Sequence, residues 1–160
     1  MRVLVVMGSD SDYKAVEPGI KFFDEFNIEY QVRVCSAHRT PHIAADLAAN
    51  AKSNGFKVII AAAGKSAHLA GVLAANTTLP VIGIPVKTSD LGGFDSLLST
   101  VQMPSGVPVA TVAIDGGKNA AILAAQILAL GNEDLGLKLE QFKKDMEQQV
   151  IQKDMEINKK

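Results

Sequence analysis

A histidine and an arginine stand side by side in a short polar segment of the chain, Ser36–Pro41. Histidine is the side chain that gains and loses a proton most readily near neutral pH, so it suits proton transfer. The arginine guanidinium carries a fixed fork of donors that matches a phosphate group. Either residue alone is more typical of a surface or capping position. Together, His38 and Arg39 indicate a site that binds an anion and moves a proton.

A second polar segment, Gly8-Ser9-Asp10-Ser11-Asp12, precedes a predicted helix. Free backbone N–H groups and the helix dipole at such a position favour an anion. Serine and aspartate there also act as ordinary helix caps, and taken alone the segment favours capping. Because two carboxylates would repel a phosphate held against them, we expect one of them to bind sugar hydroxyls or to cap the helix.

A third segment, Ala63–Gly71, is rich in small residues and resembles the nests in which backbone amides bind anions. It could hold a carboxylate or carbon dioxide. His68 within it is either a satisfied histidine in the first turn of a helix, which we favour, or a catalytic group. His42 is predicted to be a solvated helix residue.

Several other kinds of chemistry find no support in the sequence. No histidines and carboxylates have metal-ligand spacing on one helix, and neither Gly-x-x-x-x-Gly-Lys-Ser/Thr nor Gly-x-Gly-x-x-Gly occurs, so a metal or dinucleotide cofactor is not indicated. No serine lies in a Gly-x-Ser-x-Gly elbow, which argues against acyl-enzyme chemistry. The single cysteine, Cys35, excludes internal disulfides, and a buried cysteine at a strand end is favoured over a reactive one.

Composition narrows the class of protein further. The 160 residues, 48% hydrophobic and 21% charged, fit one globular domain with a real core. A net charge of −1 and the absence of tryptophan argue against nucleic acid binding. The N-terminal apolar run is too short for a signal peptide, and no run approaches the roughly eighteen residues of a membrane span. We therefore expect a cytoplasmic protein that has no membrane partner.

These segments must be positioned by a sheet. Continuous apolar runs, typical of parallel strands covered on both faces, predict strands at Arg2–Met7, Ile28–Cys35, Lys57–Ala63, Pro80–Ile84 and Val107–Ile114. Capping residues and periodicity predict helices from Asp10 to about Phe26, from Pro41 to Gly55, and over residues 67–76, 93–102 and 118–130. Such alternation indicates a doubly wound α/β domain, whose ligands bind at the carboxyl ends of the strands. The three polar segments each follow a predicted strand there.

The C-terminal segment differs in composition. Residues 1–131 form the predicted catalytic domain, and residues 132–160 hold 13 of the 33 charged residues. Apolar residues at helical spacing predict an amphipathic helix that packs either on its own domain or on a neighbouring subunit; they are Leu135, Leu139, Phe142, Met146 and Val150. The nearly uncharged helix at 118–130 must also be covered, which favours a homo-oligomer.

At these residues the sequence resembles the 5-(carboxyamino)imidazole ribonucleotide mutase family of purine biosynthesis. The resemblance covers about residues 3–130 and depends on six ordered motifs: Met7–Asp12, Ser36–Pro41, Ala67–Leu69, Pro80–Val86, Asp95–Leu97 with Val101–Pro104, and Asn119–Ala121 through Gln126–Leu128. It implies a flavodoxin-like three-layer α/β/α domain with a doubly wound parallel sheet and an added C-terminal helix. It also implies a homo-octamer that uses no cofactor or metal.

The resemblance also assigns roles to residues. It implies that Ser9, Asp12 and Arg39 bind a small-molecule ribonucleotide and that His38 is the catalytic proton-transfer residue. Further substrate contacts are expected at Gly8, Ser11, Ser36, Gly64, Lys65, Ser66, His68 and Leu69. The implied isomerase moves a carboxyl group from the exocyclic nitrogen to ring carbon 4 through transient carbon dioxide. A closed pocket must retain that carbon dioxide, and residues 64–71 are the expected lid wall.

One segment departs from the family's pattern. Ala62, Lys65, Ser66 and Ala70 stand where the family has Gly, Gly, Ala and Pro. A basic residue followed by serine is typical of the related carboxylases, which add free carbon dioxide to aminoimidazole ribonucleotide. Those carboxylases place lysine where Arg39 stands, so the mutase remains the first hypothesis. The alternatives are the carboxylase and a non-catalytic nucleotide- or phosphosugar-binding module.

Overall fold

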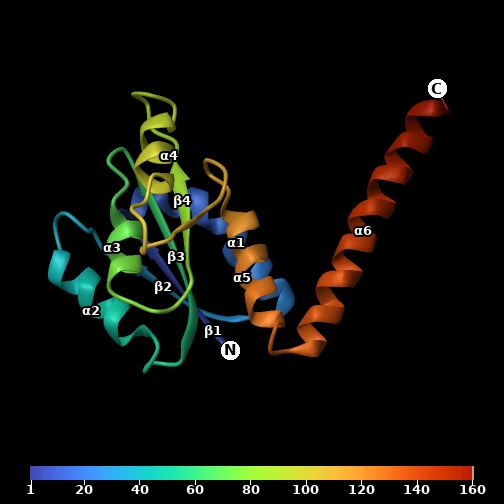
Figure 1. Cartoon of the computed structure of the whole chain (residues 1–160). Helices are drawn as coiled ribbons and strands as arrows, with labels where there is room; N and C mark the ends of the chain where they lie inside the picture. The colour runs from blue at the N-terminus through green and yellow to red at the C-terminus, as the bar shows by residue number, and fades with distance from the viewer. Residues whose placement is uncertain (160) are drawn as a thin grey trace.

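Five parallel strands form the central sheet of the computed structural model, which describes residues 1–159 (Figure 1). They are β1 (Arg2–Met7), β2 (Glu29–Val34), β3 (Phe56–Gly64), β4 (Val81–Val86) and β5 (Ala110–Thr111). Their order across the sheet is β2-β1-β3-β4-β5, and each neighbouring pair is parallel. This is the strand order of flavodoxin-like folds. The predicted fold class is therefore confirmed.

Helices cover both faces of the sheet, which explains why its strands are apolar without interruption. Figure 1 shows α1 (Tyr13–Phe26) and α5 (Gly117–Ala129) on one face and α2 (Pro41–Ala51) and α3 (Leu69–Ala75) on the other. In β1, Val3 and Val5 are buried in the cluster with α1 and α5, while Leu4 and Val6 belong to the cluster with α2 and α3. The short helix α4 (Phe94–Val101) follows β4, and a 3-10 turn, η1 (Asp10–Asp12), precedes α1.

The fifth predicted strand is wrong in length. The sequence indicated residues 107–114, but only Ala110–Thr111 pair regularly with β4. Val112 still donates to the Gly83 carbonyl and Asp115 to the Pro85 carbonyl. Pro85 has no N–H to donate to β5, so the pairing between β4 and β5 lacks one hydrogen bond at this point. The other predicted elements are present with ends shifted by a few residues.

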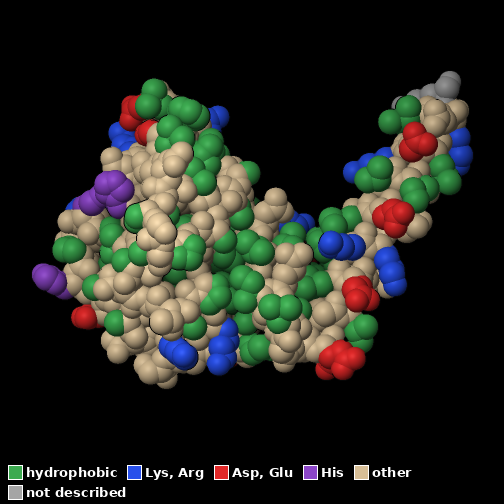
Figure 2. Space-filling view, in the orientation of Figure 1, with side chains coloured by type: hydrophobic (Ala, Val, Ile, Leu, Met, Phe, Trp, Pro, Cys, Tyr) green, Lys and Arg blue, Asp and Glu red, His purple; other side chains and the backbone are tan. Residues whose placement is uncertain are grey.

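The last helix, α6 (Glu133–Asn158), contacts the domain only through its first turns. Leu135 is buried, and the Phe142 ring packs edge-on against Phe22 and Phe26 at centroid distances of 5.7 and 5.6 Å. Beyond that point the helix stands clear of the domain, with apolar and charged side chains on its surface (Figures 1 and 2). Among residues 1–159, no helix combines the length and the apolar character that crossing a membrane requires.

Helices α1 and α5 approach each other at glycines, which yields a test of the fold. A Cβ on Gly19 would lie 2.6 Å from the Gly117 carbonyl oxygen, so Gly19→Ala should force the helices apart and destabilise the protein by about 1–3 kcal/mol. Denaturant unfolding measures this change. Gly136→Ala in α6 is the matched control, because its Cβ would meet nothing within 4 Å. Equal stability of the two variants would contradict the close packing.

Candidate active site

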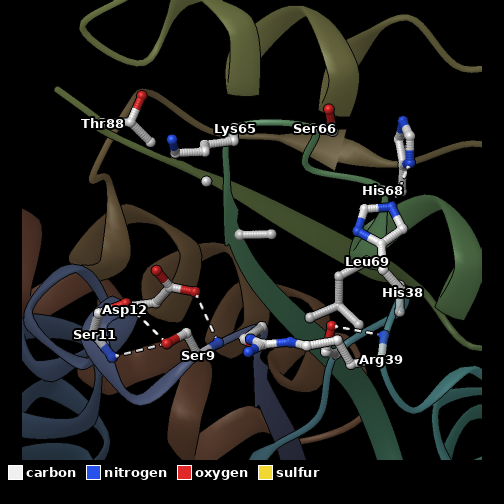
Figure 3. Close-up of a pocket in the computed structure, with 15 residues that line it drawn as sticks. Ser9, Ser11, Asp12, His38, Arg39, Lys65, Ser66, His68, Leu69 and Thr88 are labelled. Atoms are coloured by element: carbon white, nitrogen blue, oxygen red, sulfur yellow. Dashed lines mark hydrogen bonds between the residues drawn. The ribbon is translucent and has the colours of Figure 1, made fainter. Parts of the chain in front are cut away.

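The three polar segments meet at the carboxyl edge of the sheet around a single cavity of about 460 Å³ (Figure 3). We call them the first loop (Gly8–Asp12, after β1), the second loop (Ser36–Thr40, after β2) and the third loop (Lys65–His68, after β3). All twelve site residues predicted from the sequence line this cavity. They are Gly8, Ser9, Ser11, Asp12, Ser36, His38, Arg39, Gly64, Lys65, Ser66, His68 and Leu69.

The first loop is built as a capping box. The Ser9 hydroxyl accepts from the Ser11 N–H at 3.3 Å, and the Asp12 carboxylate accepts from the Ser9 N–H at 3.1 Å. The capping expected for this segment is therefore present, and it fixes the loop that precedes α1. Because these residues also line the cavity, the loop still presents hydroxyls toward a ligand.

Asp12 is the one charged side chain in this loop that the fold buries, at 8% exposure. Burial raises the pKa of Asp12 above its ordinary value of 3.8, and the hydrogen bonds from Ser9 and Ser11 offset part of that rise. The fold therefore keeps a carboxylate at this cavity against its own desolvation cost. A carboxyl group whose pKa is shifted by burial is typical of functional sites.

The second loop is held rigidly by its own hydrogen bonds. The Thr40 hydroxyl accepts from the Ser36 N–H at 3.0 Å and donates to the Ser36 carbonyl at 2.9 Å, and the Ser36 hydroxyl accepts from the Arg39 N–H at 3.1 Å. Pro41 then begins α2. As a result the guanidinium of Arg39 reaches the first loop, where it donates to the Gly8 carbonyl at 3.5 Å.

His38 and His68 form a pair that no sequence pattern indicated. Nε2 of His38 lies 2.8 Å from Nδ1 of His68, and the two rings are nearly perpendicular at 81°. Two imidazoles at this distance share one proton, so one ring donates while the other accepts. His68 is thus satisfied at the start of α3, as expected, but its partner is the predicted catalytic residue. Figure 3 shows both rings on one side of the cavity.

The third loop closes the cavity opposite the first (Figure 3). Lys65 has a left-handed backbone, with φ of 55°, and its ammonium pairs with Asp90 at 2.7 Å. Thr88, which follows β4, also lines the cavity and was missed from the sequence. The rule that ligands bind at strand carboxyl ends applies to β4 as well, so its position after that strand was the available signal.

The arrangement brings one guanidinium, a hydroxyl-bearing loop and an imidazole pair to one cavity. It can bind an anion on the Arg39 side and transfer a proton on the His38 side. Among residues 1–159, no three histidine, cysteine or acidic side chains converge as metal ligands. Cys35 is buried beneath the second loop, with its sulfur 3.5 Å from the Thr40 hydroxyl. It is a packing residue, as expected.

Comparison with known proteins gives consistent results. The family model described as AIR carboxylase matches residues 2–149. The N5-carboxyaminoimidazole ribonucleotide mutase of Thermotoga maritima is 51% identical over 95% of this chain and 89% of its own. The phosphoribosylaminoimidazole carboxylase of Candida glabrata is 51% identical over 93% of this chain, but that match covers 26% of the longer protein. The crystal structure of Treponema denticola PurE superimposes with a TM-score of 0.88 at 29% identity, covering 97% of each chain.

The burial of Asp12 predicts a gain in stability when its charge is removed. Asn can still accept from the Ser9 N–H, so Asp12→Asn should raise Tm at pH 7 by up to about 4 °C. Since the pKa of Asp12 is raised in the folded state, the native carboxyl is favoured when protonated, and the gain should shrink as the pH falls toward 4. Thermal unfolding at both pH values measures this. Asp10→Asn, in an exposed part of the same loop, should show no such rise in Tm. A lower Tm for Asp12→Asn at pH 7 would contradict the prediction that the buried charge of Asp12 destabilises the protein.

Proposed function

The chain belongs to the AIR carboxylase family, and from this premise we propose that it is an N5-carboxyaminoimidazole ribonucleotide mutase, an isomerase of purine biosynthesis. This is the activity named for the Thermotoga relative, and it is the one predicted from the sequence. The observation that carries the proposal is the cavity that joins Arg39 and the first loop to the ring of His38. An anionic ribonucleotide and a proton-transfer group meet there.

The proposed reaction needs one group that gives and then takes a proton. When the bond between the exocyclic nitrogen and the carboxyl carbon breaks, carbon dioxide leaves and the nitrogen receives a proton from His38. Ring carbon 4 then attacks the carbon dioxide, and His38 accepts the proton that carbon 4 loses. The histidine ends in its starting state, so the reaction is an isomerisation. A positioned acid/base of this kind contributes roughly a hundred- to ten-thousand-fold in rate.

Binding and catalysis fall to opposite sides of the cavity. Arg39 donates to the phosphate, the hydroxyls of Ser9 and Ser11 supply further contacts, and Asp12 accepts from ribose hydroxyls. These contacts place the imidazole ring of the substrate beside His38, because Arg39 and His38 both extend from the second loop. Support comes from the hydrogen bond by which Arg39 already reaches the first loop. Of the other predicted contacts, Gly64, Ser66 and Leu69 form the wall around the migrating carboxyl group.

His68 acts on His38 rather than on the substrate. Its Nδ1 is in hydrogen-bond contact with Nε2 of His38, which fixes the tilt of that ring and leaves His38 Nδ1 for the substrate. The shared proton also sets which nitrogen of His38 carries a hydrogen. We therefore assign His68 as a positioning residue.

A second candidate activity is carboxylation of aminoimidazole ribonucleotide by free carbon dioxide. Lys65 and Ser66 favour it, because they match the pattern of that branch, and one relative carries the name of such a carboxylase. The two activities differ in substrate and are separated by assay. Purified protein is given the carboxyamino substrate, or aminoimidazole ribonucleotide with bicarbonate, and turnover of the second alone would establish the carboxylase.

We also propose that the chain works as a homo-octamer in the cytoplasm. Apolar side chains on the distal part of α6 are exposed, including Val150 at 66% and Ile157 at 72%. Most of the stability of a helix in a protein comes from the packing of its amphipathic face, so the exposed part of α6 favours docking on a neighbouring subunit. The subunit number itself follows from the family resemblance.

Replacing the catalytic imidazole should separate chemistry from binding. His38→Asn is expected to lower kcat for the carboxyamino substrate by at least about a hundredfold, because the proton-transfer group beside the reacting atoms is lost and His68 stands behind it. Affinity for the product ribonucleotide, measured by calorimetry, should change little. Unaltered turnover would refute the assignment and favour the non-catalytic binding module. His42→Asn, on an exposed part of α2, is the matched control.

Removing the guanidinium should mainly weaken binding. Arg39→Ala is predicted to raise KM roughly ten- to a hundredfold with a smaller change in kcat, since a lost charge-assisted hydrogen bond acts on ground and transition states alike. Steady-state kinetics measure both constants. Arg33→Ala, outside the cavity, controls for the loss of one positive charge. An unchanged KM would place the phosphate elsewhere.

A further inference from the structure

Lys65 has a backbone conformation that its residue type disfavours. Its φ of 55° lies in the left-handed region, where glycine is unstrained and lysine is not. Residues held in this way persist where the surroundings over-determine them, and they cluster at functional sites. The strained residue also lines the cavity. The contacts that hold Lys65 in this conformation therefore affect the shape of the cavity.

An ion pair holds the side chain of Lys65. Its Nζ lies 2.7 Å from Oδ2 of Asp90, in the loop that follows β4. The hydrogen bond with Asp90 raises the pKa of Lys65, and the same bond lowers the pKa of Asp90, so both groups are held in their charged forms. Asp95, in the first turn of α4, adds a further attraction on the ammonium. We call the Lys65–Asp90 pair the strap.

The strap joins two loops that already touch. Gly64 is in register with Val86 where β3 pairs with β4, so the loops after these strands leave the sheet side by side. A Cβ on Gly64 would lie 2.9 Å from the Thr88 Cγ2, which shows how closely the end of β3 approaches the second of these loops. Lys65 and Thr88 both line the cavity. The strap therefore lies at the rim where the third loop closes the cavity.

The strap is able to open. The side chains of Lys65 and Asp90 are 68% and 57% exposed, and exposed ion pairs are weak and screened by salt. The second loop, by contrast, is fixed by short hydrogen bonds between Ser36 and Thr40. Of the two loops, the third is thus the one whose first residues, Lys65 and Ser66, can move aside for a ribonucleotide and then return, while His68 stays on His38.

We infer that the strap holds the third loop closed during the reaction and retains carbon dioxide between its release and its recapture at carbon 4. Lys65 and Asp90 are then positioning residues for the migrating carboxyl group, although neither touches the reacting atoms. This inference depends on the proposed function. It predicts a specific defect when the strap is broken: the carboxyl carbon escapes while substrate binding is preserved.

Isotope washout tests the strap. The carboxyamino substrate labelled with ¹³C in its carboxyl group is converted in unlabelled bicarbonate, and loss of label from the product reports escape. Lys65→Asn removes the charge, while asparagine tolerates the left-handed backbone. We expect this variant and Asp90→Asn to lose label about two- to fivefold more than the wild type, with KM little changed. Raising the salt to about 1 M should increase washout in the wild type only.

Restoration and a matched control make the result specific. The exchanged pair Lys65→Asp with Asp90→Lys should bring washout back toward the wild-type level, which a merely structural defect would not do. Lys87→Asn removes an exposed lysine near the strap and should behave as the wild type. Unchanged washout in both single variants, or no recovery in the exchanged pair, would overturn the strap. Failure of the proposed function is distinguishable in the wild type, which would then form either no carbon-4 carboxylated product or, if it is a carboxylase, product that carries no label; the inference would fall with it.

Discussion

Two backbone hydrogen bonds at the carboxyl edge of the sheet fix the points at which the three loops of the cavity leave it. The Cys35 N–H donates to the Met7 carbonyl at 2.8 Å, and the Gly8 N–H donates to the Ala62 carbonyl at 3.0 Å. They continue the ladders of β1 with β2 and with β3 past the ends of the regular strands. The first, second and third loops therefore leave the sheet from three adjacent points, and the crossover in strand order opens a crevice between them. Burial of β1 on both faces holds this edge in place.

The cavity that results carries a positive charge on Arg39 and a negative charge on Asp12. A different set of contacts stabilises each of them. Arg39 extends from a loop fixed by its own hydrogen bonds, so its guanidinium is available to an anion without reorganisation. Asp12 is buried within a capping box, and the raised pKa of its carboxyl shows that the fold bears an electrostatic cost there. Asp12 thus has a structural role as the acceptor of the Ser9 N–H, and in the proposed function a bound ribonucleotide offsets the cost of its buried charge.

The sequence predicted the sheet and the cavity well because both follow from local patterns. Continuous apolar runs defined β1 to β4, and the polar residues after β1, β2 and β3 proved to line one cavity. The short β5 was missed because the strand predicted at Pro80–Ile84 ended before Pro85, whose missing N–H removes a donor toward β5. Contacts between distant residues were equally out of reach. His38 and His68 are 30 residues apart, and Lys65 meets Asp90 across two loops whose conformations no periodicity encodes.

The two loops that close the cavity differ in rigidity, and the difference fits the reaction. The second loop presents His38 and Arg39, which in the proposed reaction transfer a proton and bind the phosphate, and both tasks need closely placed atoms. Hydrogen bonds between Ser36 and Thr40 fix that loop, and His68 fixes the ring of His38 from the other side. In the proposed reaction the third loop has a different task, because a ribonucleotide enters past Lys65 and carbon dioxide is retained behind it. An exposed ion pair on a strained lysine is strong enough to bias closure and weak enough to release it. In the proposed reaction, the rigid second loop holds the groups that take part in bond making, and the more weakly held third loop retains carbon dioxide.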